Sequence, residues 1–166
     1  MNFKFLIFLP VFIFCSGCYS FKGIAIPPDI RTFYVVDFQF DANVLSAPGD
    51  LNQRFAEALR TKIRNESRLI FNENEPDIEF SGRISSFNVQ PEALQAGNTV
   101  ALNRLSISIN VEFKNNKDEK KNWTKAFSFF RTFDSTQDFL SLQDGLIREI
   151  FDQLTENVFN EAFTGW

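Results

Sequence analysis

The sequence predicts a two-layer α+β sandwich: a four-stranded, mostly antiparallel sheet with two helices on one face, in the order β-α-β-β-β-α. Three observations carry this prediction. Residues 105–113 alternate apolar and polar side chains, which is typical of a strand with one buried face. Residues 51–63 and residues 142–158 each repeat an apolar side chain at every fourth position, as one-sided helices do. Such helices and such a sheet bury their apolar surfaces by packing against each other.

The first strand is expected at Arg31–Phe40, where apolar side chains occupy both faces. That pattern is typical of a strand in the middle of a sheet. The second strand begins at Leu69, is interrupted by the polar residues 72–76, and continues from Ile78 to Val89. Its apolar phase changes near Ser85 and Ser86, which predicts a bulge there.

The last two strands are expected to form a long antiparallel hairpin, with the charged residues 114–121 as its turn. The first helix should begin after Asp50 as its cap, with Gln53 at the capping-box position, and end near Ser67. The second helix should run for about 20 residues from a cap at Asp138 or Ser141 and end at Gly165.

The N-terminus has the features of a secretory signal peptide. Lys4 supplies positive charge, Phe5–Phe14 is an apolar run too short to span a bilayer, and Ser16-Gly17-Cys18 follows. Ser16-Gly17-Cys18 resembles the end of a bacterial lipobox, in which the cysteine thiol takes the lipid, although Cys15 stands where a large aliphatic residue is usual. We therefore predict a signal peptide at 1–17, a tether at 18–30 lipidated on Cys18, and one domain at 31–166.

The composition excludes several classes of function. The chain has no His, so histidine-based catalytic triads, Cys-His pairs and His-ligated metal sites are ruled out. Its net charge of −4 argues against a nucleic-acid partner. The acidic segment Asn72–Asp77 could hold a hard cation, but it lacks the glycine and closing Glu of an EF-hand loop, and a solvated turn is the favoured interpretation. We expect no enzymatic activity, no catalytic residues, no cofactor and no metal.

Two clusters of basic side chains are candidates for binding anionic groups. Lys117, Lys120 and Lys121 crowd the predicted hairpin turn, where their ammonium groups could bind phosphorylated glycolipid heads. The alternative is a soluble hairpin end that resists aggregation. The second cluster surrounds the end of the first helix, where the helix dipole favours cations in any case; it comprises Arg60, Lys62, Arg64 and Arg68.

Two further runs of the mature chain resemble a known family. The run Cys18-Tyr19-Ser20-Phe21-Lys22-Gly23, followed by Ile26-Pro27-Pro28-Asp29-Ile30-Arg31-Thr32, resembles the mature start of LptE-family lipopolysaccharide-assembly lipoproteins of the Bacteroidetes-type branch. Leu51–Leu69 resembles that family's first helix and following strand. The resemblance implies a four-stranded sheet with two helices on one face. It also implies a non-enzymatic role, anchored in the outer membrane on the periplasmic side, with an LptD-type β-barrel and lipopolysaccharide as partners.

Three functions stay open at this point. The first is a subunit that assembles with and plugs the barrel, for which polar strand faces such as Ser106, Ser108 and Asn110 would suit a polar lumen. The second is an envelope lipoprotein that binds a ligand or stabilises another secretion complex. The third, a carboxylate-based hydrolase, is the least favoured. Of the family's functional residues, only Cys18 carries over by motif, so the lipopolysaccharide role of Lys117, Lys120 and Lys121 rests on their charge.

Overall fold

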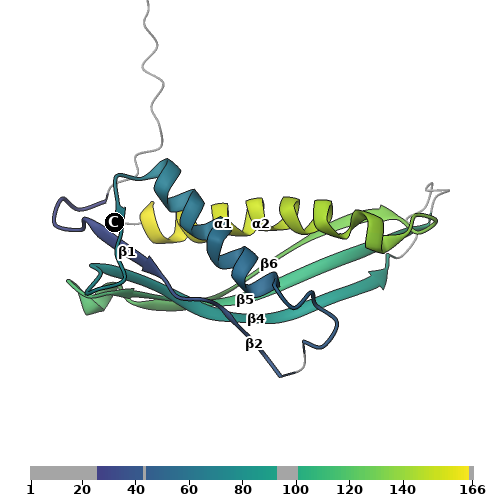
Figure 1. The fold of residues 1–166 in the computed structure, drawn as a ribbon, viewed down its shortest axis with the longest axis horizontal. Helices are drawn as coiled ribbons and strands as arrows, with labels where there is room; N and C mark the ends of the chain where they lie inside the picture. Colours follow the sequence, from purple (N-terminus) through teal and green to yellow (C-terminus); the bar gives the residue numbers. More distant parts are fainter. Residues whose placement is uncertain (1–25, 43, 93–100, 165–166) are drawn as a thin grey trace, which may run out of the picture.

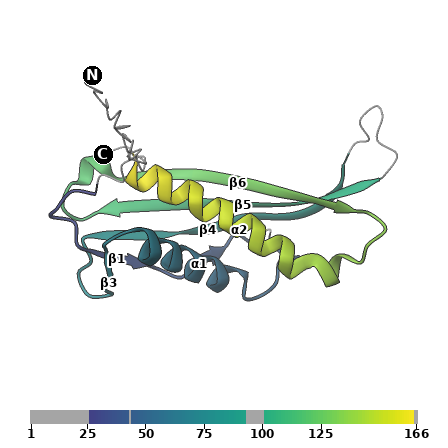
Figure 2. The same ribbon diagram turned by 90° about the horizontal axis from the view of Figure 1, so that it is seen from above.

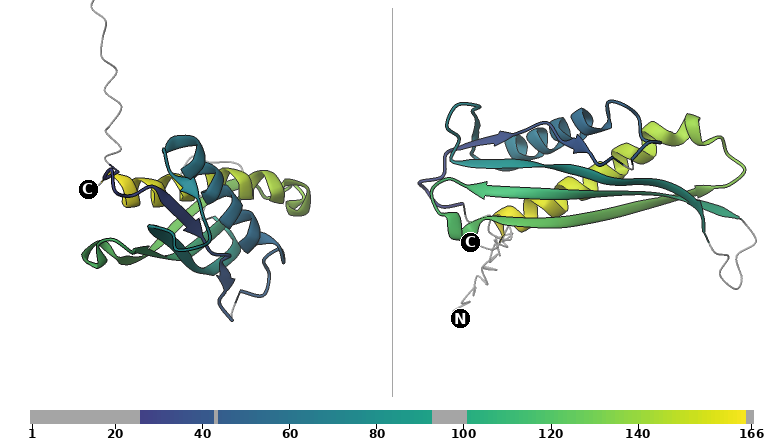
Figure 3. Two further views of the ribbon diagram at one scale, coloured as in Figure 1. Left: turned by 60° about the vertical axis from the view of Figure 1, so that its left-hand side comes forward. Right: turned by 90° about the horizontal axis from the view of Figure 1, so that it is seen from below.

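A computed structural model describes residues 26–42, 44–92 and 101–164 of the chain. Two helices lie side by side on one face of a single twisted sheet (Figure 1). In the described residues the other face of the sheet carries no helix (Figure 3). The predicted two-layer α+β class and its core order are thus confirmed.

The sheet is mixed, with long antiparallel strands on one side and short parallel ones on the other. Its strand order is β3-β1-β4-β5-β6, and β2 pairs separately with β4. The pairs β1–β3, β1–β4 and β2–β4 are parallel, whereas β4–β5 and β5–β6 are antiparallel. The strands are β1 (Thr32–Val35), β2 (Gln39–Phe40), β3 (Ile70–Phe71), β4 (Ile78–Pro91), β5 (Leu102–Asn115) and β6 (Trp123–Asp134).

The predicted strand Arg31–Phe40 is divided into β1 and β2 by a local slip in register. Val35 pairs with Phe80 and Gln39 pairs with Arg83, so residues 36–38 lie opposite residues 81–82. The extra residue lets Phe38 turn into the core, where it is 1% exposed and packs edge-on against Phe55. Periodicity did not reveal this interruption, because Thr32–Val35 before it and Phe40 after it all favour a strand.

The long strands match the predicted pattern. One row of β5 is buried under the helices and consists of Leu105, Ile107, Ile109, Val111 and Phe113. The register of β4 against β5 shifts between Ile84 and Ser86, so the predicted bulge is confirmed. Because of this bulge, the side chain of Phe87 points to the same buried face as Ile84, although the two residues are an odd number of positions apart.

Helix α1 (Leu51–Glu66) buries the predicted stripe of Leu51, Phe55, Leu59 and Ile63. Its C-terminus is confirmed at Ser67, whose hydroxyl and N–H both donate to the carbonyl of Ile63. The predicted capping box is wrong, because the Asp50 side chain makes no capping hydrogen bond. The N–H of Leu51 instead donates to the Pro48 carbonyl, so a preceding turn satisfies this donor.

Helix α2 (Phe139–Phe163) crosses the sheet diagonally (Figure 2). It begins at the predicted cap, where Asp138 accepts from the N–H of Ser141 at 3.1 Å. The expected last residue, Gly165, lies outside the described residues. Phenylalanines fill the space between the layers: Phe55 of α1 meets Phe151 of α2 at 5.2 Å between ring centroids, and Phe80 of β4 meets Phe163 at 6.2 Å.

Candidate functional site

The hairpin turn that carries the predicted lysines is held by asparagine side chains. Asn115, only 1% exposed, accepts the N–H groups of Lys117 and Asp118 on its side-chain oxygen, at 2.8 and 2.9 Å. Asn122 accepts the N–H of Asn115 at 2.7 Å. The 3-10 turn η1 (Glu119–Lys121) follows, with Asp118 as its N-cap. The turn is therefore built by local capping, and its lysines are positioned by a fixed backbone.

Lys117 is engaged within the protein. Its ammonium group lies 3.1 Å from Asp77 Oδ1, while Asp77 Oδ2 accepts the N–H groups of Arg31 and Thr32. Partial burial alone would raise the pKa of Asp77, but the hydrogen bonds from Arg31, Lys117 and Thr32 outweigh it and lower the pKa to about 2. Lys120 is exposed and Lys121 is half-buried. The structure thus gathers the three lysines in one turn, and Lys117 is committed to an ion pair with Asp77.

The acidic segment lies beside this basic turn. Asn116 donates its N–H to the Asp77 carbonyl and its amide to the Pro76 carbonyl, at 2.9 and 2.7 Å. Within the segment, Asn72 accepts the N–H of Asn74, and Glu75 adopts a φ of 51°. These contacts form a turn, as the favoured interpretation had it. Among the described residues, no group of three or more His, Cys, Asp or Glu is placed to hold a metal ion.

The basic side chains around the end of α1 all have partners inside the protein. Arg60 donates to the Val35 carbonyl at 2.8 Å and pairs with Asp37 at 2.9 Å. Arg64 pairs with Glu57 at 3.0 Å. Arg68 binds the carbonyls of Ile26, Pro27 and Ile30, where the described chain begins. This cluster therefore serves the fold, and its residues are not gathered around a common binding surface.

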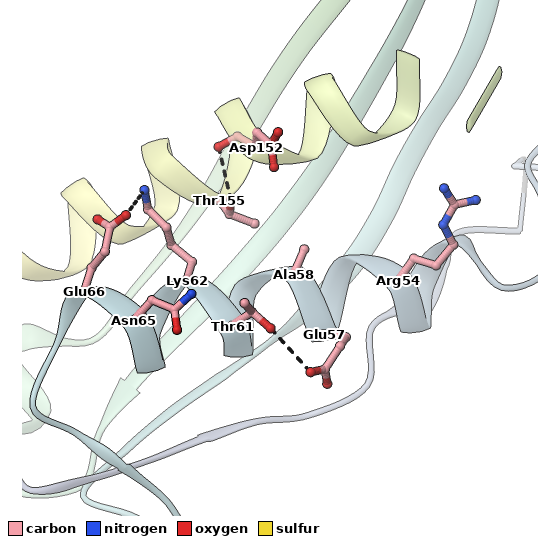
Figure 4. A pocket seen from close by; sticks show the side chains of 9 residues that line it. All are labelled: Arg54, Glu57, Ala58, Thr61, Lys62, Asn65, Glu66, Asp152 and Thr155. Atoms are coloured by element: carbon pink, nitrogen blue, oxygen red, sulfur yellow. Dashed lines mark hydrogen bonds and ion pairs between the residues drawn. The ribbon is translucent and has the colours of Figure 1, made fainter. Parts of the chain in front are cut away.

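A groove of about 610 Å³ runs between the two helices (Figure 4). Lys62 of α1 is ion-paired with Glu66 at 2.6 Å and with Glu156 of α2. Burial alone would lower the pKa of Lys62, but its hydrogen bonds to Glu156 and Glu66 outweigh this and raise it. The hydrogen bond from Lys62 lowers the pKa of Glu156. The lining residues are Arg54, Glu57, Ala58, Thr61, Lys62, Asn65, Glu66, Asp152 and Thr155.

The polar side chains that line this groove bind one another or the backbone and so hold the two helices together. Thr61 shares a hydrogen bond with Glu57, and Thr155 donates to the Asp152 carbonyl at 3.1 Å. The hydroxyls are thus bound to a carboxylate or to the backbone, and the Lys62 ammonium is held between carboxylates. The contact between the helices cannot be predicted from the sequence, because Lys62 and Glu156 are 94 residues apart and each is only a polar position beside an apolar stripe.

Cys18, the predicted lipid-attachment site, lies outside the described residues, as does most of the predicted tether. Neither helix in the described part of the chain has the length and apolar character that a membrane-spanning segment needs.

Comparison with known proteins connects the fold to a family. A family model described as LptE, lipopolysaccharide-assembly, matches residues 30–162. A search of curated proteins finds no match.

Three solved structures resemble the fold. A hypothetical protein from Chlamydia trachomatis has a TM-score of 0.57 and 8% identity, and the alignment covers 80% of this chain and 97% of that one. A minor lipoprotein from Acinetobacter baumannii has a TM-score of 0.52 and 8% identity, with coverages of 80% and 92%. A protein from Xanthomonas campestris has a TM-score of 0.51 and 11% identity, with coverages of 78% and 81%. At these identities the likeness concerns the fold alone.

Proposed function

The chain belongs to the LptE family of lipopolysaccharide-assembly proteins, and from this membership we propose that it assembles with and plugs an LptD-type β-barrel during lipopolysaccharide export. The observation that carries the proposal is the extent of the match, residues 30–162, which runs from the residues before β1 into the last turn of α2. The family is non-catalytic, and the chain has no His with which to build the common catalytic arrangements.

The open face of the sheet supports a plugging role. Ser106, Ser108 and Asn110 of β5 are half-buried on the row opposite the buried one, and Ser108 donates to Ser128 of β6 at 3.0 Å. The interior of an outer-membrane barrel is polar, so a face of small hydroxyl and amide side chains suits it. A plug with an apolar face there would leave polar lumen groups without hydrogen-bond partners.

The attachment to the membrane is part of the proposal. We place residues 1–17 in a signal peptide, the lipid on Cys18, residues 18–30 in the tether, and the domain at 31–166. The protein would then sit on the periplasmic side of the outer membrane. Membership of the Bacteroidetes-type branch rests on the resemblance of the N-terminal runs and stays a prediction.

Lipopolysaccharide binding at the hairpin turn is the finer part of the proposal, with Lys117, Lys120 and Lys121 as the cationic groups. The exposed ammonium of Lys120 supports it. Lys117 would have to share its charge between a phosphate and Asp77. Charge reversal of all three lysines should weaken lipopolysaccharide binding severalfold, and Lys120→Glu should weaken it more than Arg148→Glu, a change of equal charge at an exposed position on α2. Unchanged binding by the triple variant would remove this assignment.

The proposed function itself is tested by purifying the tagged protein from detergent-solubilised outer membranes and identifying its companions by mass spectrometry. A large β-barrel of the LptD type should be recovered in stoichiometric amount, and depletion of the protein should lower surface lipopolysaccharide. Recovery of the protein alone, or with an unrelated pore, would favour the alternative of an envelope lipoprotein that serves another complex.

A further inference from the structure

The connection between β6 and α2 carries a sequence motif that the proposed function does not use. Asp134 is the only aspartate of the chain that a serine or threonine follows, and a second hydroxyl residue comes next, giving Asp134-Ser135-Thr136. This triplet resembles a bacterial O-glycosylation acceptor, in which the aspartate precedes the hydroxyl that takes the sugar. The connection lies at the end of the molecule opposite the start of β1, and residues 135–138 are exposed (Figure 2). The triplet is therefore open to an approaching enzyme.

The backbone of the triplet is held in one shape by hydrogen bonds. Asp134 Oδ1 accepts from the N–H of Thr136 at 2.8 Å and from its hydroxyl at 2.7 Å. The N–H of Ser135 donates to the Ala101 carbonyl at 3.0 Å, and the N–H of Gln137 donates to the Asp134 carbonyl at 3.1 Å. The two bonds from Thr136, the N–H bond first, lower the pKa of Asp134. A charged carboxylate therefore stands in a fixed position beside Ser135 at neutral pH.

The hydroxyl groups of this connection differ in whether they are already bound. The Thr136 hydroxyl donates to the Asp134 carboxylate, and the Ser141 hydroxyl at the start of α2 donates to the Asp138 carbonyl at 2.7 Å. Ser135 is exposed, and within the described residues its hydroxyl has no hydrogen-bond partner. An acceptor hydroxyl has to lose its proton and approach the sugar, so a free hydroxyl reacts without breaking an existing bond. The geometry therefore favours Ser135 as the acceptor over its two neighbours.

We propose that Ser135 is an O-glycosylation site, modified by a glycosyltransferase that recognises the adjacent carboxylate of Asp134. Ser135 Oγ attacks the anomeric carbon of a sugar that is carried on a diphosphate donor. The bond between Oγ and the anomeric carbon forms, the bond from that carbon to the phosphate oxygen breaks, and the phosphate leaves with the electron pair. The hydroxyl proton passes to a base of the transferase. Asp134 Oδ2 is available for recognition, because it has no partner in the described part of the chain.

The charges around Ser135 favour a sugar over a phosphoryl group as the modification. A phosphoryl group would bring a charge of about −1.5 to −2 next to the carboxylates of Asp134 and Asp138, which would repel it. A neutral sugar adds bulk and hydroxyl groups without that repulsion, and an exposed turn accommodates the bulk. The modification needs no barrel, so it is independent of the proposed function.

The experiment locates the sugar by mass spectrometry. The full-length protein is purified in detergent from the cells that naturally make it, and its tryptic peptide 132–148 is fragmented by electron transfer, which keeps O-linked sugars in place. The wild-type peptide should carry the mass of at least one sugar residue on Ser135. Ser135→Ala should lose this mass completely, because it keeps the N–H bond to Ala101 and lacks only the hydroxyl. Ser141→Ala removes another hydroxyl of the same peptide and should keep the sugar, so it is the matched control.

Asp134→Asn tests the recognition of the carboxylate. The asparagine keeps an oxygen for the two bonds from Thr136 but carries no charge, so the fraction of Ser135 that is modified should fall roughly tenfold. An unchanged fraction overturns the role of Asp134. An unmodified wild-type peptide, a phosphate in place of the sugar, or a sugar on Thr136 or Ser141 overturns the assignment of Ser135. An unmodified protein that still co-purifies with an LptD-type barrel would contradict the glycosylation alone and leave the proposed function standing.

Discussion

Lys117 donates to Asp77 at 3.1 Å and thereby joins the turn of the β5–β6 hairpin to the loop before β4. The second oxygen of the same carboxylate accepts the N–H groups of Arg31 and Thr32 at the start of β1. The N–H of Asp77 in turn donates to the Thr32 hydroxyl at 2.9 Å. One acidic side chain therefore connects three segments that are distant in the sequence, at the end where the chain enters the domain.

This carboxylate should make the folded state sensitive to acid. The pKa of Asp77 is about 2 in the folded protein against an ordinary 3.8, because its hydrogen bonds outweigh the effect of burial. A pKa lowered by folding adds stability that is fully present above the ordinary value and is lost as the pH falls from there towards 2. We expect a loss of roughly 1–2 kcal/mol of unfolding free energy in this window, after allowance for solvent screening. Urea unfolding at a series of pH values measures it.

Asp77→Asn is the control for the acid effect. The variant keeps the shape of the side chain but does not titrate, so its stability curve should be flatter between neutral pH and about 2. It should also be less stable than the wild type at neutral pH by about 1–3 kcal/mol, because Lys117 loses its charged partner. Equal slopes for the two proteins would show that other carboxylates cause the acid sensitivity.

The role of Asp77 shows where sequence reasoning reached its limit. The alternating pattern of β5, the phase change near Ser85 and the cap at Asp138 are local signals, and all three were read correctly. Asp77 looked like the end of a solvated acidic turn, because its partner Arg31 lies 46 residues before it and Lys117 lies far after it in the sequence. The parallel pairing of β1 with β4 brings Arg31 to Asp77, and the antiparallel pairing of β4 with β5 brings Lys117 there.

The contact between the helices can be measured through Lys62 and Glu156. The Lys62 side chain is 18% exposed and that of Glu156 is 40% exposed, so the pair is partly shielded from water. A double-mutant cycle with Lys62→Met and Glu156→Gln should give a coupling energy of about 1 kcal/mol. The surface pair Arg64–Glu57, exposed by 52% and 57%, is the matched control and should give about 0.3 kcal/mol. Equal couplings for both pairs would contradict a stabilising contact across the groove.

The break between β1 and β2 leads to a prediction about Gly82. A Cβ atom at this position would lie 2.1 Å from the Asn110 carbonyl oxygen and 2.6 Å from the Phe38 ring. In the sequence, Gly82 is one member of the alternating row Ile78, Phe80, Gly82 and Ile84, so neither this close approach nor the slip that turns Phe38 inward could be predicted. Gly82→Ala should therefore destabilise the protein by about 1–3 kcal/mol, because strand β5 and the Phe38 ring must both move.

Gly145→Ala provides the comparison for Gly82→Ala in thermal unfolding. Gly145 lies within α2, and a Cβ atom there meets nothing within 4 Å. The alanine should raise stability by about 0.5–1 kcal/mol, through its higher helix propensity. The two substitutions add the same methyl group, so opposite shifts of the melting temperature are expected. A Gly82→Ala protein as stable as the wild type would mean that the space above Gly82 can open at little cost.

Measuring membrane attachment can distinguish the roles of the two N-terminal cysteines, Cys15 and Cys18. If Cys18 carries the lipid, Cys18→Ser should leave the protein without acyl chains, each of which contributes about 0.8 kcal/mol per buried methylene to membrane binding. The variant should move from the membrane fraction to the soluble fraction of the periplasm, and it should lose the mass of the lipid. Cys15→Ser is the control, because it changes a thiol of the same leader segment but keeps the acceptor. If the Cys15→Ser protein were released and the Cys18→Ser protein stayed in the membrane fraction, the lipid would be on Cys15, and the assignment to Cys18 would be wrong.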